Sequence, residues 1–354
     1  MRTKDEIIES LNKLQLVTGR PIDADESAIA ESMQKNNSGQ SITVKILSVI
    51  AGLLACVAFY ASLIISGLYN SASGLLITGT FCITVAILIC KSLNKIIFDT
   101  VSVSSYVIGF ALLGLGLYEL KVDEDYISVL FIVVALLSLT ISGNYILSFV
   151  SVLIISGSIL TLIVSNREYN LIHVYVSAMA VFLSYLIANE AAIIVRSKAV
   201  SKLYDPLRVG LTFAFLAGLL LIGTTGMLKD YAEHLWVSSV FIFGAIIYVL
   251  LALVTVLEIT KVHHKVYVFA CVLLLLPTIQ WPAIAGSILL MLLSFLVNFK
   301  TGFVVAVAAF IYFVCQYYYD LNATLLTKSL ILLSSGALFL LLYFITRKKL
   351  LSHE

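Results

Sequence analysis

A few ionisable side chains lie inside long apolar stretches of this sequence, where a charge is costly and marks a place that could bind a proton, an ion or a polar substrate. Glu190 is the strongest candidate. In a helix, the six residues from Glu190 to Arg196 span about 9 Å, which places the carboxylate near the inner headgroup boundary. Two interpretations follow. Glu190 is either a coupling carboxylate that binds a proton or cation, or an interfacial carboxylate paired with Arg196 or Lys198.

Two prolines interrupt an apolar stretch further along the chain, in the segment Leu276-Pro277-Thr278-Ile279-Gln280-Trp281-Pro282. Broken helices are a common feature of transporter binding sites, because their freed backbone groups can line a cavity. Pro277, Trp281 and Pro282 are therefore a candidate broken-helix site. The alternative is a tight external turn in which Trp281 anchors the chain at the membrane interface.

A third group of polar and aromatic residues follows near the C-terminus. It comprises Tyr318, Tyr319, Asp320, Thr324 and Lys328, and is called the outer patch below. Its acid, base and hydroxyl groups at one helix mouth could receive a ligand or a partner protein. The alternative is an aromatic belt, which enriches tyrosine at membrane interfaces without further function.

Signals for an enzyme are absent from the sequence. It contains no nucleotide-binding glycine loop, no nucleophile motif and no zinc-protease motif, and its five cysteines lie in apolar runs without zinc-ligand spacing. His263 and His264 are adjacent, so they point to different sides of a helix, and no third metal ligand accompanies them. His173 is predicted to be a hydrogen-bonded packing residue. We expect no enzymatic activity, no metal and no cofactor.

The composition defines the elements that position these residues. Of the 354 residues, 61% are hydrophobic and 12% are charged, and the mean hydropathy is +1.06. A soluble domain is about half apolar and about a quarter charged, so the solvent around this chain must be lipid. The net charge of +2 excludes nucleic acid as an expected partner. Because a bilayer satisfies no backbone polar groups, the fold class is an all-α, polytopic transmembrane helical bundle.

The chain divides into three predicted segments. Residues 1–41 form a cytoplasmic arm of two amphipathic helices, residues 42–345 the transmembrane domain, and residues 346–354 a basic cytoplasmic tail. The transmembrane domain contains about twelve apolar runs, at 42–66, 72–90, 96–118, 126–142, 144–164, 171–195, 208–227, 235–258, 266–279, 282–297, 302–319 and 325–345. The number falls to ten if the runs joined at 142–144 and at 277–282 are re-entrant pairs.

The distribution of Lys and Arg predicts the topology. With a cytoplasmic N-terminus, the inner segments hold 18 of the 22 basic residues, and the outer loops hold Lys121, Arg167, Lys229 and Lys328. Cytoplasmic loops carry such an excess. Both termini are therefore expected inside, and no loop after residue 41 is large enough for a catalytic domain.

The C-terminal part also resembles a known family. Residues 317–349 are similar to the closing signature of a domain-of-unknown-function family of bacterial polytopic inner-membrane proteins. The matching positions are Tyr318, Tyr319, Leu321, Thr324, Leu325, Leu326, Lys328, Ser329, Leu332 and Gly336. The segment from Trp281 to Phe299 is similar to the family's preceding region. The resemblance implies a multi-pass protein of the inner membrane, and a partner in the form of a small membrane-anchored protein with a GDYxxLxY motif.

Two hypotheses result. The first is a non-enzymatic subunit of a bacterial envelope complex that holds a partner through the outer patch or the N-terminal arm. The second is a secondary transporter or flippase of a small molecule or lipid, with Glu190 as the coupling carboxylate and the Pro277–Pro282 break near the substrate. The two predict different interiors: a polar cavity reaching a buried charge for the transporter, and a packed middle with polar rims for the subunit.

Overall fold

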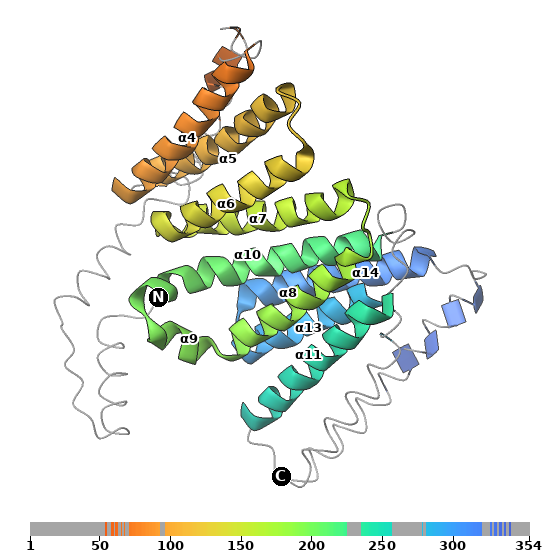
Figure 1. Cartoon of the computed structure of the whole chain (residues 1–354). Helices are drawn as coiled ribbons and strands as arrows, with labels where there is room; N and C mark the ends of the chain where they lie inside the picture. The colour runs from red at the N-terminus through yellow and green to blue at the C-terminus, as the bar shows by residue number, and fades with distance from the viewer. Residues whose placement is uncertain are drawn as a thin grey trace, which may run out of the picture. The chain divides into compact units, whose positions relative to one another are not determined.

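The computed structural model of the chain describes residues 71–92, 96–224, 235–256 and 281–320, with isolated positions elsewhere. Every regular element in those ranges is an α-helix (Figure 1). The chain divides into two compact units between Leu112 and Leu113, inside α5. The predicted arm (1–41), the basic tail (346–354) and most of the apolar runs at 42–66, 266–279 and 325–345 lie outside the described residues.

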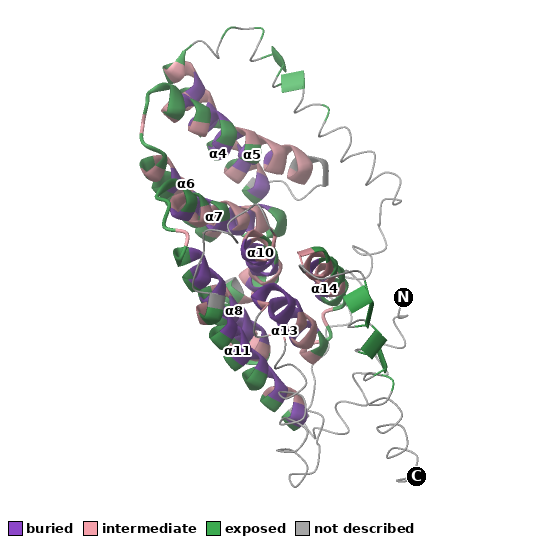
Figure 2. Cartoon of the chain, turned by 90° about the vertical axis from the view of Figure 1, so that its right-hand side faces the viewer, coloured by how far each residue is buried: buried purple, intermediate pink, exposed green. Residues whose placement is uncertain are grey.

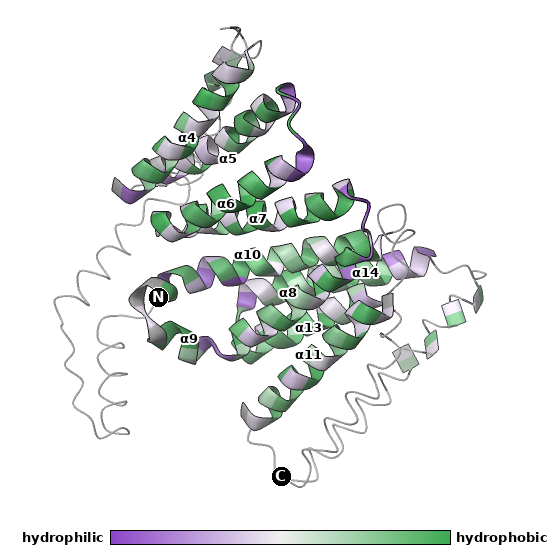
Figure 3. Cartoon of the chain, in the orientation of Figure 1, coloured by the Kyte–Doolittle hydropathy of each residue, from purple (hydrophilic) through white to green (hydrophobic). Residues whose placement is uncertain are grey.

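From α5 to α10, and from α13 to α14, the helices follow one another with short connections. They are α4 (Ala72–Ser92), α5 (Ile96–Glu119), α6 (Glu124–Ser142), α7 (Tyr145–Ser165), α8 (Leu171–Ala188), α9 (Glu190–Arg196), α10 (Lys198–Gly223), α11 (Leu235–Val256), α13 (Pro282–Leu296) and α14 (Lys300–Asp320). Eight of these described helices are long and apolar enough to cross a membrane: all except α9 and α13. Hydrophilic residues gather in the α5–α6 and α7–α8 loops (Figure 3).

Most of the predicted runs inside the described ranges match a helix to within a few residues, but two do not. The run 171–195 is broken at Asn189 into α8 and α9. The next helix, α10, begins at Lys198, ten residues before the predicted start at 208. Its first turns carry Lys202, Asp205 and Arg208, and the first two of these lie outside the predicted run. The total of twelve spans stays a prediction.

The connection at 142–144 joins two separate helices. Gly143 adopts a left-handed conformation (φ 58°), which glycine tolerates and which ends α6. Asn144 then caps α7, because its side-chain oxygen accepts hydrogen bonds from the backbone N–H of Ile146 (2.9 Å) and of Leu147 (3.4 Å). With 19 residues in α6 and 21 in α7, each helix is long enough to span, so this pair is not a short re-entrant element.

The first unit contains α4 and most of α5, which approach each other closely. A Cβ atom added at Gly109 of α5 would lie 2.9 Å from the carbonyl oxygen of Gly79 in α4. Ser102 of α5 donates a hydrogen bond to the carbonyl of Ala86 in α4 (2.5 Å). Small residues therefore bring these two backbones together, as is common where helices pack in a membrane.

In the second unit, the helices form a continuous packed core. Helix α7 packs against α6 and α10, α8 against α10 and α11, and α13 against α11, α10 and α14. Large apolar side chains from six helices form one cluster, with Phe215, Leu219, Ile246 and Leu289 fully buried. Buried positions concentrate on α8, α10 and α13 (Figure 2). Helix α13 has 15 residues, most of them buried, so this short helix is an interior element.

Several buried serines of this core form hydrogen bonds within their own helices. Ser151, Ser177 and Ser184 each donate to the carbonyl four residues earlier in their own helix. His173 is fully buried and hydrogen-bonds Ser238 of α11 through Nδ1 (3.1 Å), which confirms the prediction of a packing histidine. Cys82 and Cys90 are buried as expected, whereas Cys315 is exposed on α14 and is no core residue.

Candidate functional site

The candidate coupling carboxylate lies at a break between two helices. Helix α8 ends at Ala188, Asn189 leaves the helical conformation (φ −104°, ψ 25°), and Glu190 begins α9. The Asn189 amide donates to the carbonyl of Tyr185 (2.9 Å) and contacts the Tyr248 hydroxyl of α11 (3.4 Å). The asparagine side chain therefore adds a second hydrogen bond to the Tyr185 carbonyl, which also accepts the Asn189 backbone N–H, and connects this turn to the neighbouring helix.

Glu190 is paired with a cation that the sequence analysis did not assign to it. Its Oε1 lies 3.3 Å from a terminal nitrogen of Arg208 in α10, and the other terminal nitrogen of Arg208 lies 2.7 Å from Oδ1 of Asp205. The Arg208 side chain is 13% exposed, Glu190 30% and Asp205 60%. Asp205 is thus the closer carboxylate but the more hydrated one, and Glu190 is the more sheltered partner.

Aromatic rings enclose the guanidinium. Arg208 lies 4.3 Å from the centre of the Phe299 ring and 5.3 Å from that of the Tyr204 ring. Both distances are within the range of cation–π attraction. Tyr204 is itself buried, and its hydroxyl donates to the carbonyl of Leu186 in α8 (3.4 Å). Phe299 lies in the connection between α13 and α14. We call Arg208, Glu190, Asp205, Tyr204 and Phe299 the arginine cluster.

The arginine cluster joins three parts of the fold through one charge. It connects the α8–α9 break, the first half of α10 and the α13–α14 connection. The cluster therefore holds these elements together, and a cation binding at Glu190 would have to compete with Arg208.

Local spacing could have indicated part of this cluster. Asp205 and Arg208 are three residues apart, which places them on one face of a helix. The link from Arg208 to Glu190 spans 18 positions and depends on the break at Asn189, so no spacing rule reveals it.

The described residues of the two other predicted sites lie at the same end of α13 and α14. Trp281, at the start of α13, packs edge-on against Tyr317 of α14 with ring centres 4.6 Å apart. Pro282 occupies the first turn of α13, where its missing N–H costs no hydrogen bond. On α14, Tyr318 and Tyr319 contact each other (5.9 Å), and Asp320 accepts a hydrogen bond from Gln316 (3.1 Å). Pro277, Thr324 and Lys328 lie outside the described residues.

The outer patch and the arginine cluster are at opposite ends of α13 and α14. Helix α13 runs from Trp281 toward Phe299, and α14 returns from Lys300 to Asp320. At 1.5 Å per residue, α13 alone separates the two ends by about 22 Å. Within the described part of the chain, no three His, Cys, Asp or Glu side chains gather to hold a metal ion.

Long apolar helices, a lipid-like composition and charges that lie mostly near helix ends define this chain as a multi-pass, all-α integral membrane protein. The chain belongs to the family described as domain of unknown function DUF4401, which matches residues 42–349. The match covers the whole predicted transmembrane domain, and so extends well beyond the C-terminal resemblance. No curated protein and no solved structure matches the chain.

Proposed function

We propose that this protein is a non-enzymatic subunit of a bacterial inner-membrane complex, and that it holds a partner protein through the outer patch. The observation that supports this most directly is the packed middle of the second unit. Fully buried Phe215, Leu219, Ile246 and Leu289 fill the space between helices that a substrate path would cross. Apart from Asp205 and Arg208 in the first half of α10, the charged groups of the described helices lie near helix ends, as expected for a scaffold with polar rims.

The outer patch has the properties of a protein-binding surface. Tyr319 is 76% exposed at the end of α14, beside Tyr318 and Asp320. Tyrosine supplies a large contact area and a polar hydroxyl at low entropic cost, and for this reason it is enriched at interfaces. The Trp281–Tyr317 contact supports this end of α14 from the adjoining helix. The partner implied by the C-terminal resemblance is a small membrane-anchored protein with a GDYxxLxY motif.

The test is co-purification of the tagged, full-length protein from its native membrane in mild detergent, with mass spectrometry of the bound proteins. We expect a stoichiometric small envelope protein with the wild type, and at least a tenfold loss of it with Tyr319→Ala, because interface tyrosines often carry 1.4 kcal/mol or more. Tyr126→Ala is the matched control, since Tyr126 is also exposed (71%) and begins a different helix. Equal recovery with both variants would exclude the outer patch as the binding surface.

A second candidate, a secondary transporter, is favoured by one observation. The helix break at Asn189, directly beside the sheltered Glu190, is the type of discontinuity found at ion and substrate sites of transporters. The same purification distinguishes the two functions. A chain that purifies without a protein partner but with a bound small molecule would favour transport and direct attention to Glu190.

A further inference from the structure

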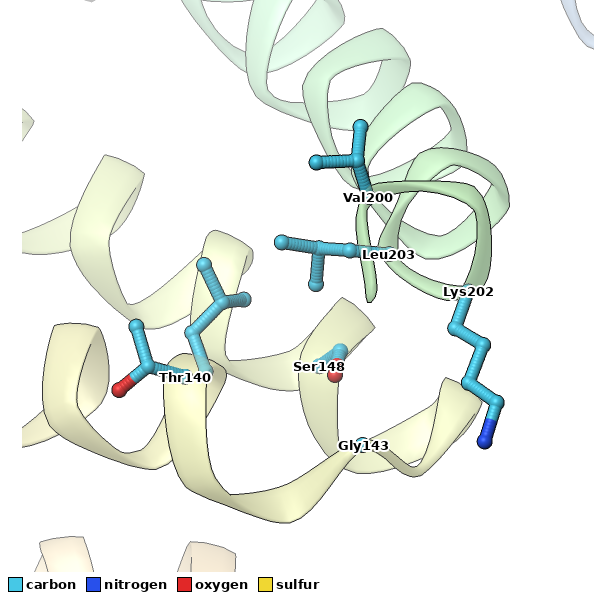
Figure 4. A pocket seen from close by; sticks show the side chains of 7 residues that line it. Thr140, Gly143, Ser148, Val200, Lys202 and Leu203 are labelled. Carbon is cyan, nitrogen blue, oxygen red and sulfur yellow. The ribbon is translucent and has the colours of Figure 1, made fainter. Parts of the chain in front are cut away.

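A cavity of about 540 Å³ lies between α6, α7 and α10 (Figure 4). Leu139 and Thr140 line it from the end of α6, Ser148 from α7, and Val200, Lys202 and Leu203 from α10. Leu139, Val200 and Leu203 give it a mainly apolar lining. Gly143 contributes no side chain, which leaves the end beside the α6–α7 turn open. This cavity is separate from the arginine cluster and from the outer patch.

Lys202 gives the cavity a positive charge at its margin. Its side chain extends from α10 on the side of Gly143, while Leu203 points toward the interior (Figure 4). The natural partner for Lys202 would be Asp205, three residues further along the helix, but Asp205 is bonded to Arg208 at 2.7 Å. Among the described residues, the Lys202 ammonium therefore has no carboxylate within ion-pair distance.

We infer that this cavity is a binding site for one anionic phospholipid of the surrounding bilayer. Its apolar walls fit an acyl chain, and Lys202 is placed to contact the phosphate of the headgroup. The position also fits, because the cavity lies at the ends of three helices that are long and apolar enough to span. A lysine at this level keeps its ammonium in the polar headgroup layer while its methylene stem lies along apolar surface. Anionic lipid is preferred because no carboxylate in the described part of the chain neutralises Lys202.

The site is tested by native mass spectrometry of the full-length protein, titrated with phosphatidylglycerol or with phosphatidylethanolamine of the same acyl chains. We expect saturable binding of one phosphatidylglycerol, tighter than that of phosphatidylethanolamine. Lys202→Gln should weaken phosphatidylglycerol binding about fivefold, since one lysine near a membrane surface contributes about that factor, and should weaken phosphatidylethanolamine binding less, because the ammonium of that headgroup balances its phosphate. Lys91→Gln, which removes another exposed lysine at a helix end that does not line the cavity, is the control.

A second variant tests the apolar part of the cavity. Thr140 is exposed at the rim, so Thr140→Phe should occupy the space without disturbing buried neighbours, and should reduce binding of both lipids. Equal affinity of the wild type for the two lipids, or the same phosphatidylglycerol affinity in Lys202→Gln and Lys91→Gln, would overturn the inference.

The occupant can be identified directly in native membranes. A photoreactive amino acid at position 140 should form an adduct with phospholipid. Cross-linking to another segment of this chain or to a partner protein instead would show that a polypeptide fills the cavity. Either result leaves the co-purification test of the outer patch unaffected.

Discussion

Arg208 is the residue on which the most elements converge. It forms two ion pairs and two ring contacts while only 13% of its side chain is exposed, and its Nε is buried without a hydrogen-bond partner in the described structure. Buried charges are costly unless they are paired, so removing one partner destabilises more than removing both. We therefore expect the contributions of Arg208 and Glu190 to the free energy of unfolding to be strongly coupled.

This coupling is measurable as a double-mutant cycle with Glu190→Gln and Arg208→Gln. Arg208→Gln alone should reduce the free energy of unfolding by about 1–3 kcal/mol, less than a fully buried pair would lose, because Glu190 is 30% exposed. The double variant should recover about 1 kcal/mol of the summed losses. Equilibrium unfolding in mixed micelles with increasing dodecyl sulfate gives the free energy of unfolding of the wild type, the two single variants and the double variant. Strict additivity would mean that Glu190 and Arg208 do not interact.

Arg167→Gln serves as the control for loss of an arginine. Arg167 lies in the exposed α7–α8 loop, and its change should leave the unfolding free energy within about 0.5 kcal/mol. Arg208→Lys should have a free energy of unfolding between those of the wild type and Arg208→Gln. A lysine keeps the charge but cannot present the planar guanidinium to two carboxylates.

At the level of helices, close packing depends on particular glycines. A Cβ atom added at Gly210 of α10 would lie 2.8 Å from the Cβ of Val152 in α7, and that atom cannot rotate away. At Gly244 of α11 an added Cβ would meet no atom within 4 Å. The same substitution, glycine to alanine, should therefore have different effects on stability at the two positions.

We expect Gly210→Ala to cost about 1–3 kcal/mol by forcing α7 and α10 apart. Gly244→Ala should be neutral, or stabilising by up to about 1 kcal/mol, because alanine favours the helix over glycine. Thermal unfolding of both variants in the same detergent checks the order. A melting temperature of Gly210→Ala at or above that of the wild type would show that α7 and α10 leave room for a Cβ atom at this position.

Sequence patterns predicted most of the described elements, and they failed where charges enter a helix. Apolar runs and the Gly143–Asn144 signal identified α6 and α7 to within a few residues. The predicted start of α10 at 208 was wrong because Lys202, Asp205 and Arg208 depress local hydropathy, although Asp205 and Glu190 neutralise Arg208 in the fold. The partner of Glu190 was not predictable from sequence spacing, because the ion pair with Arg208 is a tertiary contact across a helix break.

For the whole molecule, the distribution of basic residues predicts which ends of the helices face the cytoplasm. The loop after α7 should be outside, and the α9–α10 connection should be inside. In a variant without native cysteines, Glu168→Cys should react with a membrane-impermeant maleimide on intact cells. Ser197→Cys should react only after lysis. Both positions are exposed. Labelling of the two positions from the same side would show that α8 does not cross the membrane.

The pairing of Arg208 with Glu190 also bears on how the chain is inserted during synthesis. An arginine well inside a spanning segment opposes its transfer into lipid by about 2.5–3.5 kcal/mol at the centre of the bilayer. The neutralising glutamate belongs to the preceding helix pair, α8 and α9, which leaves the ribosome first. We therefore expect α8 and α9 to wait beside the translocon until α10 arrives, so that Arg208 enters the bilayer already paired with Glu190.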